Sequence, residues 1–473
     1  MEAFNNVVLS IKDFLWGPIM LCLLIGTHVL LTIRTKVIQR KTFTGIKLSV
    51  TPDAEASGDI GGFAALATAL AATIGTGNIV GVATAIGIGG PGAVFWMWFT
   101  GLLGMATKFG EATLAVKYRV KAKDGSVKAK DGSFIGGPMY ALERGLGHKW
   151  LGVLFAIFTG IACFGIGNMT QANSIAESMN GTFGIPKIAT GIVLMGNMTQ
   201  ANSIAESMNG TFGVPKIATG IVLMIITGLV ILGGVKSISK VCEKLIPLMA
   251  GLYIVGCIVI CVINGAHIPA AFAAIVLVIT GLVILGGVKS ISKVCEKLIP
   301  IMAGLYIVGC IVICIVNGAH IPAAFAAIVK GAFNPAAAGG GFVGATVVAC
   351  IRAGVSRGLF TNESGLGSAP IVDACAATRN PSRQALISMS GVFWDTIVVC
   401  LLTGLVLVSS IIKDPVGMEG LVGANMTAGA FNAIPIVGPA VLTFGLLTFA
   451  WSTILGWSYY GERCWVYLCG FAC

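Results

Sequence analysis

The sequence predicts an all-α membrane protein that crosses a bilayer several times. Of its 473 residues, 56% are hydrophobic and only 10% are charged, which is typical of polytopic membrane proteins. The 65 glycines suit transmembrane helices that pack closely. Several uncharged stretches reach the length of about 20 apolar residues that a bilayer requires. Together these observations argue against a soluble multidomain enzyme.

The basic residues predict the orientation in the membrane. The first span, Trp16–Ile33, is followed by a basic cluster that ends at Lys47, and a second cluster, Lys117–Lys130, comes two spans later. Basic loops remain in the cytoplasm, so we expect both clusters inside and the N-terminus outside the cytoplasmic membrane. The net charge of +11 therefore needs no nucleic acid as a partner. The N-terminus shows no signal peptide.

The span Gly61–Ile86 organises the rest of the chain. It runs for 26 residues without a charge, yet its middle is Gly75-Thr76-Gly77-Asn78. Glycine is a poor helix former, so we expect the helix to open here. A bilayer tolerates the freed backbone groups only inside protein or beside a wet cavity, where broken helices bind cations and carboxylates. The alternative is close helix packing through the Gly77-x-x-x-Gly81 motif.

The spans that follow carry two polar side chains of interest. Gln171 lies in Leu151–Met179, where an amide is costly unless it meets a partner or a substrate. Asp395 is the one acid that we place clearly inside a span, either as a proton or cation carrier or as a buried acid bonded to a neighbouring helix. The other spans expected are Ala93–Val116, Phe342–Phe360, Gln384–Ser410 and Ile434–Tyr459.

Two tandem repeats interrupt the chain. Gly167–Met195 recurs as Gly196–Met224 with one difference, and Ile226–Val276 recurs as Ile279–Val329 with three. Such identity indicates recent duplication or an error in sequence assembly. The longer copy adds two helices, roughly Ala270–Val288 and Leu298–Val316, and preserves the topology.

Motifs for other functions lack the context that they need. Gly354-Val355-Ser356-Arg357-Gly358 matches a nucleophile elbow, and Gly87–Gly92 matches a dinucleotide loop, but neither has the β-strand that those motifs require. The 14 cysteines show no zinc-binding spacing. We expect no enzymatic activity.

A cation site follows from oxygen chemistry. The carbonyls of Ala71 and Ile74, freed by the opened turn, and the hydroxyls of Ser452 and Thr453 form an oxygen cage of the kind that hard cations prefer. The alternative is that both hydroxyls bond back to their own helix. The organising span has no acid to titrate, which favours Na⁺ over H⁺ as the coupling ion, although Asp395 keeps proton coupling open.

Three segments carry a family resemblance: Gly61–Arg119, Arg352–Pro370 (RAGVSRGLFTNESGLGSAP) and Phe449–Arg463 (FAWSTILGWSYYGER). They resemble the alanine or glycine:cation symporters of bacteria and archaea. The resemblance implies a leucine-transporter-type inverted-repeat fold with an extra N-terminal helix. It divides the chain into residues 1–60, with the N-terminal helix and basic loop, a first core repeat at 61–329, and a truncated second core repeat at 330–473. The tandem duplications would disturb that fold, and the last two core helices would be missing.

The same resemblance implies sodium-coupled symport of alanine, glycine and possibly serine. Its substrate contacts fall on Thr76, Gly77, Asn78 and Gln171, and we add Phe449 and Trp457 as aromatic limits on side-chain size. The expected partners are a small neutral amino acid, the Na⁺ ion and the lipid bilayer, with no obligate protein partner. The alternatives are proton-coupled transport and a non-transporting membrane protein.

Overall fold

The computed structural model describes residues 17–53, 58–121, 134–163, 279–334 and 346–469, with six single residues at 6, 10, 14, 165, 167 and 171. The chain divides into two compact units, one formed by residues 1–183 and 286–473 and the other by 184–285. The elements below belong to the first unit. The copied segments between residues 172 and 278 lie outside the described residues, and so does Gln200, the copy of Gln171 in the second Gly196–Met224 segment.

The first unit is helical apart from one short hairpin, among the residues described. The hairpin pairs β1 (Val120–Lys121) with β2 (Phe134–Ile135) in antiparallel register. Three described helices are long and apolar enough to cross a membrane, or four if one bent pair counts as a single span. These helices are α15 (Gly287–Val316), the run Pro381–Lys413 and α22 (Val437–Cys469).

The predicted opening of the organising span is confirmed. Helix α4 (Gly62–Thr73) ends before Ile74, and α5 (Val80–Gly89) begins after a single 3₁₀ turn, η2 (Thr76–Asn78). Ile74 and Gly75 have extended backbones. We call residues 74–79 the first break.

Helix α6 (Gly92–Lys117) is the scaffold beside this broken helix. It packs against α17 (Val347–Asn362) and α19 (Pro381–Val392). The approach to α17 is close, because a Cβ added at Gly354 would lie 2.4 Å from the carbonyl oxygen of Ala93. The extra N-terminal helix α2 (Pro18–Arg34) packs on α6 and is followed, after a 67° bend, by η1 (Ile38–Lys41) and α3 (Thr42–Ser49).

A second break follows α17. The helix stops at Asn362, and the next helical turn, α18, begins only at Pro370 and ends at Asp373. Three residues between them have positive φ angles: Glu363 (54°), Gly365 (93°) and Gly367 (77°). We call residues 363–369 the second break. The sequence predicts a span that ends at Phe360 and does not predict this break.

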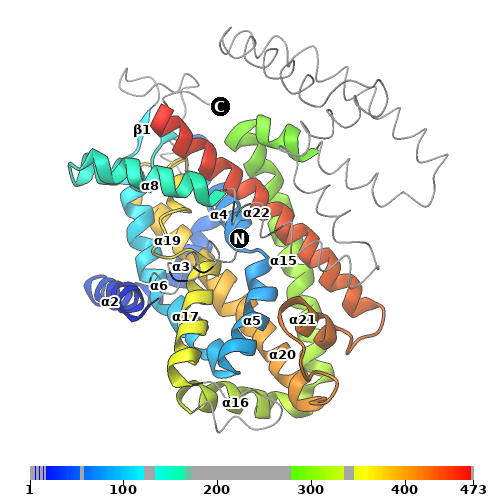
Figure 1. Ribbon diagram of the computed structural model, residues 1–473. Helices are drawn as coiled ribbons and strands as arrows, with labels where there is room; N and C mark the ends of the chain where they lie inside the picture. The colour runs from blue at the N-terminus through cyan, green and yellow to red at the C-terminus, as the bar shows by residue number, and fades with distance from the viewer. Residues whose placement is uncertain are drawn as a thin grey trace, which may run out of the picture. The chain divides into compact units, whose positions relative to one another are not determined.

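The run Pro381–Lys413 combines α19, the π-helical stretch η8 (Phe393–Cys400) and α20 (Leu401–Lys413). Helix α22 lies against α4, α8 (Lys149–Ala162) and α15 (Figure 1). The remaining elements are α7 (Pro138–Tyr140), η3 (Ala141–Gly145), η6 (Gly318–His320), α16 (Ile321–Phe333) and α21 (Gly423–Phe431).

Helix α15 corrects one predicted boundary. We expected a helix from about Leu298, with Lys289, Lys293 and Lys297 in an inner loop, but the helix begins at Gly287 and includes all three lysines. Ile291, Cys295 and Ile299 are buried at a helical spacing of four residues, while the lysines are exposed. Lysine is a good helix former, so an amphipathic pattern of this kind continues the helix.

Candidate substrate and cation site

The first break releases a backbone carbonyl. In a continuous helix the N–H of Gly75 would donate to the carbonyl of Ala71, but here it donates to Oδ1 of Asn78 at 3.0 Å. Ile74 leaves the helix with a ψ of 95°. The Ala71 carbonyl thus loses its usual donor, and the Ile74 carbonyl leaves the helical direction. These are the two carbonyls that the sequence suggests for a cation.

Gln171 meets the first break as a buried side chain. It is 2% exposed, and its Oε1 accepts a hydrogen bond from the Thr76 hydroxyl at 3.0 Å. A Cβ added at Gly75 would lie 3.8 Å from the Gln171 amide. The structure therefore brings together an amide and a hydroxyl that are separated by 95 residues in sequence.

Asn78 connects the break to Asp395. Its Nδ2 donates to Oδ1 of Asp395 at 2.7 Å and to the Asp395 carbonyl at 3.1 Å, and both residues have 0% exposure. A hydrogen bond to an ionised acceptor is about twice as strong as a neutral one. Asp395 is thus fixed to the break from the π-helical stretch η8.

The last helix brings one candidate cation ligand to the break. A Cβ added at Gly75 would lie 2.7 Å from Oγ1 of Thr453, so the two segments touch. The hydroxyls of Ser452 and Thr453 both donate to the Phe449 carbonyl at 2.9 Å. Both hydroxyls thus bond back to their own helix, which is the alternative to a role in cation binding. The bond engages only the hydroxyl hydrogen, however, and leaves the oxygen lone pairs available.

Gly77 lies under the end of α17. A Cβ at this position would approach Cγ2 of Thr361 to 2.8 Å and a ring carbon of Phe360 to 3.4 Å. Real Cβ contacts are rarely so short, so the second broken helix can pack on the first only because residue 77 has no side chain.

The two aromatic residues proposed to limit substrate size lie in different surroundings. Phe449 is fully buried, and its ring centroid lies 5.3 Å from that of Tyr306 on α15. Trp457 packs 5.6 Å from Tyr460 and touches Gly167, four residues before Gln171. Phe449 therefore belongs to an aromatic cluster with Tyr306, while Trp457 borders the segment that carries Gln171.

Polar side chains of α6 hold the second break, and the sequence analysis does not single them out. Nζ of Lys108 donates to the carbonyl of Asn362 at 3.1 Å, and Oε1 of Glu111 accepts from the N–H of Gly365 at 3.1 Å. Both residues fall in the predicted span Ala93–Val116, Glu111 close to its end and not near the middle as Asp395 is in its own span, and an ionisable side chain within a span is itself a signal of function.

A hydrogen-bonded chain joins the two breaks. Thr396 donates its hydroxyl to Oδ2 of Asp395 at 2.7 Å and accepts from Nδ2 of Asn362 at 3.2 Å. Asn78 therefore connects through Asp395 and Thr396 to Asn362, whose carbonyl receives Lys108. Such a chain can transmit a shift of one break to the other.

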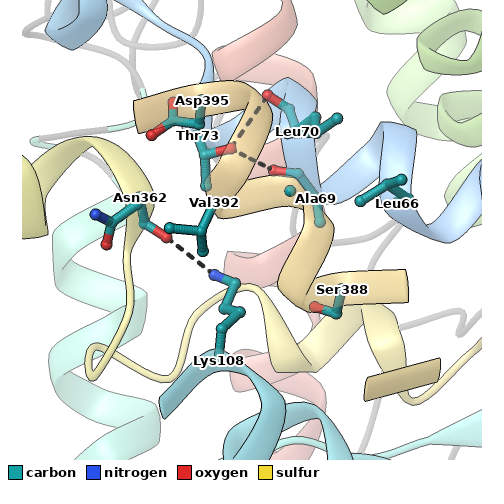
Figure 2. A pocket seen from close by; sticks show the side chains of 10 residues that line it. Leu66, Ala69, Leu70, Thr73, Lys108, Asn362, Ser388, Val392 and Asp395 are labelled. Carbon is teal, nitrogen blue, oxygen red and sulfur yellow. Dashed lines mark hydrogen bonds between the residues drawn. The ribbon is translucent and has the colours of Figure 1, made fainter. Parts of the chain in front are cut away.

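A small cavity lies beside this chain. Its volume is about 10 Å³, and its polar lining comes from Thr73, Lys108, Asn362, Ser388 and Asp395. Figure 2 shows Lys108 rising from α6 toward Asn362, with Asp395 above the same space. A space of this size holds about one water molecule.

Arg119 fixes the basic end of α6. Its guanidinium donates to the carbonyls of Ala374 and Ala376 at 3.0 and 2.7 Å and lies 4.3 Å from the Phe134 ring centroid. Burial lowers the pKa of Arg119 from its usual value, because a charged group loses solvation. The same loop forms a parallel bridge between Ile60 and Ala376, so it ties the start of the first broken helix to the end of the second.

Comparison with known proteins adds independent evidence. The sodium:alanine symporter family matches residues 1–196, 193–277 and 271–472. The chain is 42% identical to the sodium/alanine symporter AgcS of Methanococcus maripaludis over 99% of this chain and 84% of the relative. It is also 42% identical to an uncharacterized transporter of Haemophilus influenzae, over 99% and 83%, and 32% identical to the amino-acid carrier protein AlsT of Bacillus subtilis, over 98% and 78%.

These relatives are named as transporters rather than enzymes, and the apolar helices fit a multi-pass membrane protein. The chain belongs to the sodium:alanine symporter family.

Proposed function

We propose that the protein couples sodium entry to the uptake of a small neutral amino acid, with alanine, glycine and serine as its substrates, across the cytoplasmic membrane. The observation that carries this proposal is the first break, a neutral opening in a membrane helix. It offers a released carbonyl at Ala71, and its Gly75 lies beside the Thr453 hydroxyl and the buried Gln171 amide.

The substrate would bind across the first break. Its carboxylate would face the N–H groups around Gly77 and Asn78, where glycine lets the ligand approach the backbone and the start of α5 favours negative charge. Its ammonium group would meet the amide oxygen of Gln171, which now accepts from Thr76. Sodium would bind oxygen atoms from Ala71, Ile74, Ser452 and Thr453, in keeping with the preference of hard cations for oxygen.

Two helix breaks in one bundle also support the finer fold assignment. A leucine-transporter-type fold places one broken helix in each inverted repeat, and the breaks here fall in segments 61–86 and 347–373. In this proposal α2 is the extra N-terminal helix, and the N-terminus lies outside the cytoplasmic membrane.

Uptake into proteoliposomes tests the coupling ion. We expect an inward sodium gradient to drive accumulation of labelled alanine, and a protonophore to leave it unchanged. Counterflow of labelled alanine against unlabelled alanine should also be saturable. Uptake that ignores sodium and collapses with the protonophore would overturn sodium coupling, and absence of saturable counterflow would favour a non-transporting protein.

Proton coupling is the second candidate, and the position of Asp395 favours it. This buried acid contacts the first break directly through Asn78. If Asp395 carried the coupling proton, Asp395→Asn would abolish gradient-driven uptake yet retain counterflow, which needs no net proton movement. If sodium is the coupling ion, Asp395→Asn weakens alanine binding and therefore reduces both gradient-driven uptake and counterflow.

Substrate size tests the role of Phe449. Its ring is buried against Tyr306, and a rigid aromatic wall excludes larger side chains by steric clash. We expect alanine, glycine and serine to compete with labelled alanine, and leucine and phenylalanine not to compete. Phe449→Ala should admit leucine, and a variant that transports alanine normally yet still rejects leucine would remove Phe449 from this role.

A further inference from the structure

Lys108 places a buried charge in the middle of the bundle. It lies two thirds of the way along α6 and is only 3% exposed. An ammonium group has three hydrogen-bond donors, and Asn362 accepts one of them at 3.1 Å. Burying a cation costs several kcal/mol unless nearby groups compensate it, so the surroundings of Lys108 must supply negative charge.

Four carboxyl groups surround Lys108 closely enough to feel its charge: those of the half-buried Glu111 and of the buried Glu363, Asp373 and Asp395. All four accept hydrogen bonds from local donors, and Asp395 accepts from Asn78 and Thr396. Asp373 accepts from Gln384 and Ser388, Glu363 accepts from Ser368, and Glu111 accepts from the Gly365 N–H.

Asp395 is the carboxyl group that lines the same cavity as Lys108. Thr73 and Ser388 also reach this space, and Figure 2 shows it bounded by Lys108 below and by Asp395 and Thr73 above. Its volume of about 10 Å³ suits one water molecule, which can bridge the ammonium and the carboxylate. A carboxylate, hydroxyls and an amide around such a space are oxygen donors of the type that a small monovalent cation prefers.

We propose that the ammonium of Lys108 serves as a permanently bound cation beside Asp395, in the place that an additional sodium ion would otherwise occupy. Lys108 is then a positioning residue, since it acts on Asn78 through Asp395 and on the second break through Asn362. The inference deepens the proposed function and rests on it, because it assigns sodium dependence to the carbonyl and hydroxyl site alone.

Replacing the ammonium tests this assignment. In Lys108→Met the space beside Asp395 loses its cation, so an external sodium ion should take that place. We expect the Hill coefficient for sodium in alanine binding to the purified protein to rise by about one, with no such change in potassium or choline salts. Lys117→Met is the matched control, because Lys117 is exposed at the end of the same helix. A folded Lys108→Met variant with the wild-type Hill coefficient would overturn the proposal.

A double variant keeps the proposal testable if Lys108→Met folds poorly. Removing only one member of a buried charge pair leaves the other uncompensated, whereas removing both relieves it. We therefore expect the double variant, which carries both Lys108→Met and Asp395→Asn, to melt at a higher temperature than Lys108→Met alone. Its Hill coefficient for sodium should equal that of the wild type. Strictly additive changes in melting temperature would show that the two side chains are not coupled, and would overturn the proposal.

The two ideas fail in different ways. Wild-type alanine binding that ignores sodium contradicts the proposed function, and the melting temperatures of the wild type, the two single variants and the double variant still decide whether Lys108 pairs with Asp395. Sodium-dependent wild-type binding combined with an unchanged Hill coefficient in folded Lys108→Met contradicts only the role of Lys108.

Discussion

The two helix breaks use opposite chemistry for the same backbone problem. The first break, residues 74–79, contains no ionisable side chain, and neutral groups hold its backbone: the Asn78 amide bonds to Gly75, and Thr76 bonds to Gln171. The second break, residues 363–369, contains Glu363 and is held at Gly365 by the ionisable side chain of Glu111, while that of Lys108 bonds to the Asn362 carbonyl directly before it. Neutral side chains hold the first break, and ionisable side chains hold the second.

This difference suits the first break to ligand binding and the second break to structural support. A neutral opening leaves oxygen atoms and N–H groups for a zwitterion and a cation, which provide the missing charges when they bind. Bonds from Glu111 and Lys108 help to hold the backbone at the positive φ of Glu363, a conformation that costs free energy for a residue other than glycine. The hydrogen-bonded chain from Asn78 to Asn362 connects the two, so the second break sets the position of Asp395 behind the first.

Substitution of Gly75 should have the largest effect on ligand binding. A methyl group in Gly75→Ala would lie 2.7 Å from Oγ1 of Thr453 and would push α22 away from the break. Misplacement of a site by about 1 Å costs on the order of 100-fold, so we expect alanine affinity to fall by about that factor. Direct binding of labelled alanine measures it.

Gly61→Ala is the matched control for Gly75→Ala, because a Cβ at Gly61 meets nothing within 4 Å. If Gly75→Ala bound alanine as tightly as Gly61→Ala does, the first break would not be the binding site.

Glu111 tests the other side of the comparison. Glu111→Gln removes the charge from the bond to Gly365, and hydrogen bonds to charged groups contribute about 1.5–3 kcal/mol. We expect a lower melting temperature and a change in alanine affinity below about threefold, since Glu111 supports the break without touching the ligand. Glu296→Gln, at an exposed position on α15, is the control. A large loss of affinity at unchanged stability would place Glu111 in the binding site instead.

The sequence predicts the first break because its signal is local. Two glycines, a hydroxyl and an amide interrupt an uncharged apolar span, and the structure opens the helix at those residues. The second break has a similar local signal in Gly365 and Gly367, but Glu363 and its neighbours suggest a loop after the span. Helix propensity cannot distinguish a loop from a break that the chain re-enters.

The partners of the first break are not predictable from one sequence. Asn78 and Asp395 are 317 residues apart, and only the packing of η8 against η2 brings them together. Lys108 carries an adequate signal, a cation inside a predicted span, but its partner is a backbone carbonyl that leaves no trace in the sequence. The binding roles of Thr76, Gln171 and Thr453 remain predictions that the contacts support.

Thr453 should show an intermediate effect, and on sodium rather than on alanine. Thr453→Ala removes an oxygen beside Gly75 but leaves the released Ala71 carbonyl in place. One neutral oxygen contributes about 1 kcal/mol, so we expect the sodium concentration for half-maximal alanine binding to rise about fivefold. Thr448→Ala, at a half-buried back-bonded threonine on the same helix, should leave sodium dependence unchanged. Equal behaviour of the two variants would remove Thr453 from the cation site.

Gln171→Ala tests recognition of the substrate ammonium group, at a side chain that forms a neutral bond to Thr76 at 3.0 Å. Gln171→Ala removes an acceptor for the ammonium group of the substrate, and a typical neutral hydrogen bond contributes about 0.5–1.5 kcal/mol, equivalent to roughly a 2- to 13-fold loss of alanine affinity. Gln171→Glu supplies a charged acceptor at the same position and should retain or strengthen binding of the ammonium group.

Competition with propionate, which has the carboxylate of alanine but no ammonium group, separates the two ends of the substrate. Propionate should bind equally weakly to wild type and Gln171→Ala if Gln171 recognises the ammonium group. If propionate instead loses affinity as much as alanine does, Gln171 acts on the backbone of the first break through Thr76, and the neutral opening is held in place by Gln171 just as the second break is held by Lys108 and Glu111.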